Sequence, residues 1–167
     1  MRRLREHQVW ANHRLMEAAR SLSDQPLRQT FAIGQGSVLA TLVHLYAAEL
    51  VWLAAIEGDP SPMSPFDVRM QSLDELEQAW DDLEGRWERF YANLREADLG
   101  RPVTKTSALN PTAPPKTTPL ADVLLHLSLH AQYTVAQMAN MLRQLGIHPL
   151  PDTMLITLSR QQAGTSK

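Results

Sequence analysis

The sequence predicts an all-α protein built as a four-helix bundle. Four segments repeat apolar residues at the three- and four-residue intervals of a helix, and two proline-rich stretches interrupt them. With 167 residues, 44% of them hydrophobic, the chain is long enough to bury one core. We therefore expect a single domain over residues 1–160, with a long crossover between the second and third helices and a flexible tail over residues 161–167.

The composition excludes several classes of function. The 16 basic and 18 acidic residues nearly balance, so nucleic acid is not expected as a partner. Cysteine is absent, which excludes disulfides, thiolate zinc sites and a cysteine nucleophile. The N-terminus lacks the apolar core of a signal peptide, and no apolar run is expected to reach the roughly 18 residues of a membrane span. We expect a cytoplasmic protein without membrane contact.

The first two predicted helices cover about residues 2–22 and 36–57. The first ends at the sequence SDQP, and the second is apolar nearly all round, which indicates burial on more than one face. On the second helix, His44 falls on a side lined mainly by small residues: Ala40, Ala47, Ala48, Val51 and Ala55. Those alanines leave room beside the imidazole, or they let two helices approach closely.

The third and fourth predicted helices carry the clearest periodicity. Ser72 and Glu75 form a capping box at the start of the third, and Gly146 ends the fourth, which is entered through Thr118 and Pro119. The third helix repeats Leu73, Leu76, Trp80, Leu83, Trp87, Phe90 and Leu94, and the fourth repeats Leu124, Leu127, Ala131, Thr134, Met138, Met141 and Leu145. Trp80 and Trp87 are therefore expected in the core, whereas Trp52 faces either a partner or a pocket.

Two stretches are not expected to be helical. Residues 58–67 hold three prolines and predict a long ordered crossover between the second and third helices. Residues 101–119 form a proline-rich irregular segment before the fourth helix. The residues from Val103 to Thr106 are suited to one strand of a small hairpin.

His126 and His130 raise the question of a metal site. Residues four apart lie about 6 Å from each other on one helix face, so both rings can reach one ion, and His44 is the other histidine in a strongly apolar helix. Three neutral imidazoles with an open position are typical of a catalytic site. The alternative is that His126 is a boundary histidine, since it lies about 40° further from the buried seam than His130. We expect the remaining histidines, His7, His13 and His148, on the surface.

The chain resembles the DinB/YfiT-like superfamily of bacterial four-helix proteins over essentially its whole length. The segments that carry the resemblance are HQVWANHRLMEAARSL, SVLATLVHLYAAELVWLAAIEG and LLHLSLHAQYTVAQM. The resemblance implies a four-helix bundle with a long crossover, a homodimer, and a divalent metal, zinc, nickel or manganese, on three histidines.

The resemblance also implies which residues hold the metal. One ligand comes from a pattern L-x-H-x-x-x-x-E, which Leu42, His44 and Glu49 match. The other two come from H-x-x-x-H, with the second histidine three residues before a glutamine. Aligned on Gln137, His130 is the first of that pair, and Thr134 occupies the expected third-ligand position.

Thr134 is a departure from the pattern, because a neutral hydroxyl is a poor ligand beside imidazole. Three outcomes follow: the site is lost, His126 replaces the missing ligand, or the metal is held weakly with water and Glu49. The side of the helix on which Glu49 falls argues against the third outcome, and the position of His126 argues mildly against the second.

Two functions are therefore predicted as alternatives. The first is a divalent-metal-dependent enzyme, a hydrolase or a thiol-dependent transferase acting on a small molecule, with His44, His130 and His126 as metal ligands. The second is a metal-free helical module for binding or dimerisation. A di-iron site lacks its paired Glu-x-x-His elements, and a serine hydrolase lacks its G-x-S-x-G turn.

Overall fold

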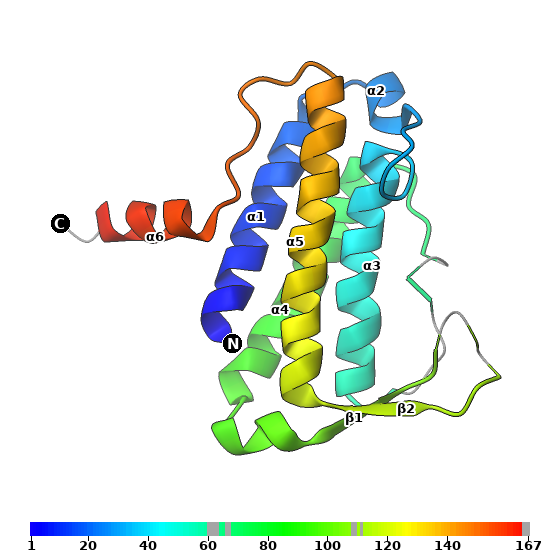
Figure 1. The fold of residues 1–167 in the computed structure, drawn as a ribbon, viewed down its shortest axis with the longest axis vertical. Coiled ribbons are helices and arrows are strands. Elements are labelled where there is room, and N and C mark those ends of the chain that lie inside the picture. The colour runs from blue at the N-terminus through cyan, green and yellow to red at the C-terminus, as the bar shows by residue number, and fades with distance from the viewer. Residues whose placement is uncertain (60–63, 66–67, 108–109, 111, 165–167) are drawn as a thin grey trace. The chain divides into compact units, whose positions relative to one another are not determined.

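The protein is mostly helical (Figure 1). The computed structural model describes residues 1–59, 64–65, 68–107, 110 and 112–164. Its elements are α1 (Arg2–Arg20), α2 (Asp24–Arg28), α3 (Val38–Ile56), α4 (Leu73–Asn93), the 3-10 helix η1 (Glu96–Gly100), β1 (Pro102–Lys105), β2 (Lys116–Pro119), α5 (Leu120–Gln144) and α6 (Leu155–Gly164). The four predicted helical segments are confirmed as α1, α3, α4 and α5, and their arrangement as a bundle stays a prediction.

The chain divides into two compact units. One comprises Met1–Leu42 with Ser128–Lys167, and the other comprises Val43–Leu127. Helices α3 and α5 each contribute to both units. The prediction of a single domain over residues 1–160 is not decided by this division, and each unit is described separately below.

In the second unit, the apolar seam of α4 is buried as predicted. The seam residues that are buried are Leu73, Leu76, Trp80, Leu83 and Trp87. The helix begins at a cap in which the Ser72 hydroxyl accepts the Glu75 N–H at 3.1 Å, while the Glu75 carboxylate accepts the Gln71 N–H at 2.8 Å. Both predictions, a capped start and two tryptophans in the core, are confirmed.

The small hairpin is also confirmed. Strands β1 and β2 pair antiparallel, with Val103 opposite Thr118 and Lys105 opposite Lys116. The pairing leads directly into α5, because the Leu120 N–H donates to the Arg101 carbonyl at 2.9 Å. The hairpin therefore stands at the start of α5, next to the last turn of α3, whose Ile56 carbonyl accepts a hydrogen bond from the Arg101 guanidinium at 3.1 Å.

In the first unit, a loop before α3 packs closely on α5. Gly34 has a φ of +58°, and a Cβ there would lie 2.9 Å from Met141 and 3.0 Å from Gln137. Glycine is favoured there by the positive φ, which strains other residues, whereas the two close side-chain ends could shift to make room for a Cβ. Just beyond this end of α5, Gly146 has a φ of +78° and ends the helix as predicted.

Two helices of the first unit were not predicted, α2 and α6. Helix α6 contacts α1. It includes residues 161–164, which belong to the tail expected from the sequence. Asp152 lies just before α6 and stabilises the start of the helix. Its carboxylate accepts the Met154 N–H at 3.0 Å and the Thr157 hydroxyl at 2.8 Å. The last residues of the predicted tail, 165–167, lie outside the described part of the chain.

His7 corrects one expectation from the sequence. We expected a surface histidine, but His7 is only 6% exposed, and its Nε2 lies 2.8 Å from the carbonyl oxygen of Thr153. The segment that precedes α6 covers it. No local pattern indicated that residues 150–164 would pack against α1, so the polar neighbours of His7 favoured a surface position.

Helix α3 corrects a second expectation. By length and apolar composition its 19 residues suffice to cross a membrane, although no such segment was expected. However, 72% of that window is buried within the protein, and a core helix meets the same criterion. The predicted crossover over residues 58–67 falls mostly outside the described residues, which include only 58, 59, 64 and 65 of it.

Candidate functional site

His44 lies in the second unit, in the first half of α3. Its side chain is half-buried, and its Nδ1 atom is buried. Burial lowers its pKa below the ordinary histidine value, because removal from water disfavours the charged imidazolium. His44 is therefore a neutral imidazole at pH 7, which is the form that binds a metal ion.

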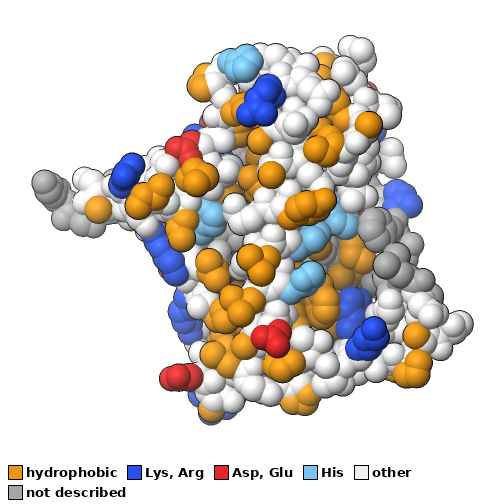
Figure 2. Space-filling model, in the orientation of Figure 1, with side chains coloured by type: hydrophobic (Ala, Val, Ile, Leu, Met, Phe, Trp, Pro, Cys, Tyr) orange, Lys and Arg blue, Asp and Glu red, His pale blue; other side chains and the backbone are white. Residues whose placement is uncertain are grey.

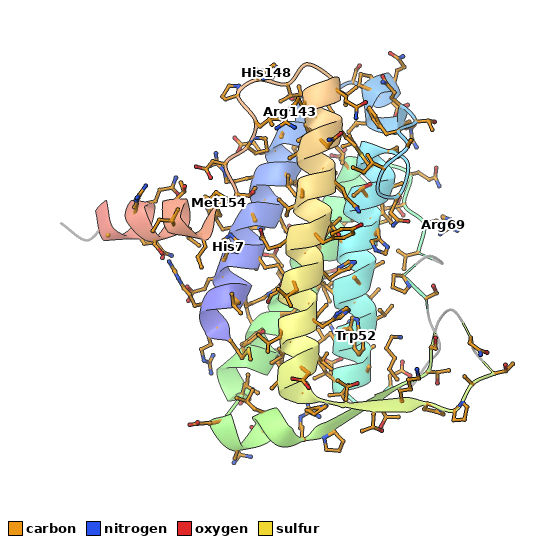
Figure 3. The ribbon with its side chains drawn as sticks, in the orientation of Figure 1. His7, Trp52, Arg69, Arg143, His148 and Met154 are labelled. Atoms are coloured by element: carbon orange, nitrogen blue, oxygen red, sulfur yellow. The ribbon has the colours of Figure 1, made fainter. Side chains whose placement is uncertain are left out.

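His126 lies in the same unit, near the start of α5, and contacts Trp52 of α3. The two ring centroids are 5.6 Å apart, with the planes tilted by 67° in an edge-to-face arrangement. His126 is exposed, in agreement with its predicted place at the boundary of the helix. Trp52, labelled in Figure 3 on the second half of α3, is half-buried, so the contact holds the imidazole against a partly covered surface.

Lys105 of β1 also contacts the Trp52 ring. The Lys105 ammonium lies 5.8 Å from the centroid of the Trp52 ring. Burial lowers the pKa of Lys105, and the nearby negative charge of Asp59 partly opposes that shift. Trp52 thus contacts both a histidine of α5 and a lysine of β1. We refer to Trp52, Lys105 and His126 as the Trp52 cluster.

Sequence reasoning did not predict the Trp52 cluster. Trp52 was expected to face a partner or a pocket, and Lys105 was given no role. One signal was available: Lys105 stands two residues after Val103, so both side chains share one face of the strand, and Val103 is buried. A lysine on the inward face of a strand is unusual enough to have suggested a site.

His130 and Thr134 lie in the first unit, one turn apart on α5. Thr134 is 2% exposed, and its hydroxyl donates to the His130 carbonyl at 3.0 Å. This bond is an ordinary one within a helix, and it occupies the one proton of the hydroxyl. Thr134 therefore serves as a packing residue of the α5 seam, as Leu127 and Ala131 do.

Glu49 is the glutamate of the L-x-H-x-x-x-x-E pattern, and it is buried. Its side chain is 1% exposed on α3. It is five residues from His44, which places it well round the helix from the histidine, as expected from the sequence. Burial at this position suits a structural role better than direct ligation beside His44.

The fit of a metal ion can be judged from these donors. His44, His126 and His130 supply imidazoles, the donor that zinc and nickel accept readily, whereas Thr134 supplies only a hydroxyl that is already bonded. Within the described residues, no group of three or more histidine, aspartate or glutamate side chains is close enough to hold a metal ion. His44 and His126 share a unit and His130 belongs to the other, so the three-histidine site stays a prediction.

The structure defines the class of the protein as mostly helical, with histidines on α3 and α5. Residues 1–165 match the DinB family, and the chain belongs to that family. Among curated proteins, it is similar to the protein DinB of Bacillus subtilis (strain 168). The two are 24% identical over 154 residues, which cover 89% of this chain and 88% of the relative. The resemblance stated from the sequence is thereby confirmed.

Proposed function

We propose that this DinB-family protein is a divalent-metal-dependent enzyme acting on a small molecule, with His44, His130 and His126 as metal ligands. The observation that carries the proposal is the half-buried imidazole of His44 on α3, whose Nδ1 atom is buried and which stands in the L-x-H-x-x-x-x-E context that the resemblance implies. The three histidines supply nitrogen donors of one chemical kind, and an open position beside them would admit substrate. Zinc, nickel and manganese are the candidate ions.

The bound ion would supply a Lewis acid that activates a water or a cosubstrate thiol for hydrolysis or transfer. The protein's own residues have simpler tasks. Neutral His44 offers a lone pair without first losing a proton, because burial lowers its pKa. The contact with Trp52 restricts the ring of His126, which reduces the entropy lost when that imidazole is fixed.

Thermal unfolding with and without added metal tests the proposal. A ligand present at 100 times its Kd stabilises the folded state by about 2.7 kcal/mol, which for a chain of this size raises the Tm by roughly 5–10 °C. We expect such a rise with zinc, nickel or manganese, and we expect His44→Ala to abolish it. His148→Gln is the matched control, because it removes an exposed imidazole that is not a proposed ligand. An unchanged Tm of the native sequence with all three ions would contradict the proposal.

One observation favours a second candidate, a metal-free module that binds a small molecule or a second copy. The position at which the family pattern expects a histidine is occupied by Thr134, and its hydroxyl is bonded within its own helix. In that case a small apolar molecule, and not a metal, would raise the Tm. A rise with metal ions that depends on His44 excludes this candidate.

We also propose that the protein forms a homodimer through the exposed face of α5. Leu129 and Tyr133 are 71% and 69% exposed, and Leu125 stands one turn before Leu129 on the same side of the helix. Figure 2 shows hydrophobic side chains along this face of α5. Exposed apolar side chains that gather on one face are typical of an interface with another protein.

A further inference from the structure

The ring of Trp52 links the hairpin to α5 within the second unit. The Lys105 ammonium of β1 lies over the indole, 5.8 Å from its centroid, and the imidazole of His126 meets the same side chain edge to face at a centroid distance of 5.6 Å. Trp52 itself is half-buried on the second half of α3 (Figure 3). Residues of β1 and α5 therefore meet on one side chain of α3.

Lys105 has a defined place beside that ring. Val103 shares its face of β1 and is 2% exposed, which anchors the strand. Burial lowers the pKa of Lys105, and the negative charge of Asp59 partly opposes that shift. Asp59 is in turn tied to the end of α3, because its N–H donates to the Ala54 carbonyl at 2.9 Å. The contact of the ammonium with the indole is therefore supported from both the strand and α3.

The imidazole of His126 depends on its neighbours for a fixed orientation. His126 is exposed, so core packing does not confine its ring, and an exposed side chain samples several rotamers unless a neighbour restricts it. The edge-to-face contact with Trp52 is one such restriction, because two rings attract each other more in this tilted arrangement than in a face-to-face sandwich. The orientation of His126 is therefore coupled to that of Trp52.

We propose that Lys105 is a positioning residue: by holding the Trp52 ring, it keeps the imidazole of His126 in one orientation. A cation over an indole is attracted by the negative face of the ring, so loss of the ammonium lets the indole turn about its side-chain torsions and weakens the edge-to-face contact. The use of the oriented imidazole as a metal ligand rests on the proposed function. The orientation does not, because the contacts that define it involve no metal ion.

NMR of the chelator-treated protein measures the orientation directly. Each tryptophan contributes one indole N–H signal, Trp52→Phe assigns that of Trp52, and His126→Gln assigns the imidazole. In the native sequence we expect nuclear Overhauser effects between the Trp52 and His126 rings, and a high order parameter for the Trp52 indole N–H, as in a rigid group. The indole signals of Trp10, Trp80 and Trp87 are internal controls in the same spectra.

Three variants isolate the role of the ammonium. Lys105→Met keeps most of the side chain and removes the charge, so the Overhauser effects between the two rings should weaken severalfold and the order parameter of the Trp52 indole should fall. Lys105→Arg places another cation near the ring and should retain both. Lys116→Met removes the lysine directly opposite, at an exposed position, and should change neither. Unchanged signals of the other three indoles show that each variant is folded.

Native-like ring contacts and order parameter in Lys105→Met would overturn the inference. So would an equal loss in Lys105→Arg, because the effect would then come from packing of the lysine and not from its charge. Zinc titration adds a second readout: Lys105→Met should weaken zinc binding about threefold or more, and Lys105→Arg should not.

The two proposals fail in different ways. Ring contacts that depend on Lys105, in a protein whose Tm no metal ion raises, would contradict the proposed enzyme and keep the positioning role. A metal-dependent rise in Tm that requires His44, with ring contacts that do not depend on Lys105, would do the reverse.

Discussion

Thr134 decides how far the family pattern extends to this chain. The pattern expects an imidazole there, and the structure has a buried hydroxyl that donates to the carbonyl of His130. The substitution itself was evident from the sequence, because it needs only the spacing to Gln137. The hydrogen bond was not, because a threonine on a helix can direct its hydroxyl to its own backbone or away from it.

Replacing this hydroxyl tests the role of Thr134 as a packing residue. Thr134→Val keeps the branched shape and removes one hydrogen bond within the helix, so the free energy of unfolding should change by about 1 kcal/mol or less. Metal content per chain should not change. Chemical denaturation and elemental analysis of the variant would check both expectations. A loss of metal in Thr134→Val would mean that the hydroxyl is a ligand and would contradict the role assigned here.

The helices differ in how well the sequence predicted them, and the reason is periodicity. Helices α4 and α5 repeat apolar residues over several turns, so their extent and buried sides were predicted closely. Helix α2 has five residues and α6 ten, too few turns for a clear repeat. The position of α6 depends on contacts with α1 from the far end of the chain, which local patterns do not encode.

Asp152 gives α6 a pH dependence that can be measured. Its pKa is lowered because the carboxylate accepts the Met154 N–H and then the Thr157 hydroxyl. A carboxyl group with a folded-state pKa below its unfolded value of 3.8 stabilises the protein above that pH, and the stabilisation is lost as the pH falls through the folded-state pKa.

Asp152→Ala should therefore lower the Tm at pH 7, and the difference from the native sequence should shrink as the pH approaches 3. Thermal unfolding followed by circular dichroism at both pH values would measure it. Asp81→Ala, at an exposed position of α4, is the control and should show no such trend. A Tm difference for Asp152→Ala that stays constant over this range would contradict the role of the carboxylate.

For the whole molecule, the sequence predicted the family, the helical class and the hairpin. These follow from patterns spread over many residues, and the match over residues 1–165 confirms the family. The Trp52 cluster was missed because it joins α3, β1 and α5, three elements far apart in the chain. Whether His130 joins His44 and His126 depends on the two compact units together, and periodicity in one helix does not contain that information.

The proposed homodimer can be tested by placing a charge on the exposed face of α5. Leu129→Glu places a charge on the exposed apolar face of α5, and burying that charge in an interface would be costly. We expect light scattering to show a dimer for the native sequence and a monomer for Leu129→Glu. Gln144→Glu adds the same charge near the end of α5 and should remain a dimer. A native monomer at micromolar concentration would contradict the proposal.

Metal content per chain tests the central claim most directly. The protein would be purified without an affinity tag and assayed by elemental mass spectrometry, together with His44→Ala, His126→Ala and the control His148→Gln. The account predicts close to one divalent ion per chain in the native protein and the control, and loss of the ion in both other variants. Metal retained in His126→Ala would contradict the ligand set, and a native protein without metal would contradict the proposed enzyme.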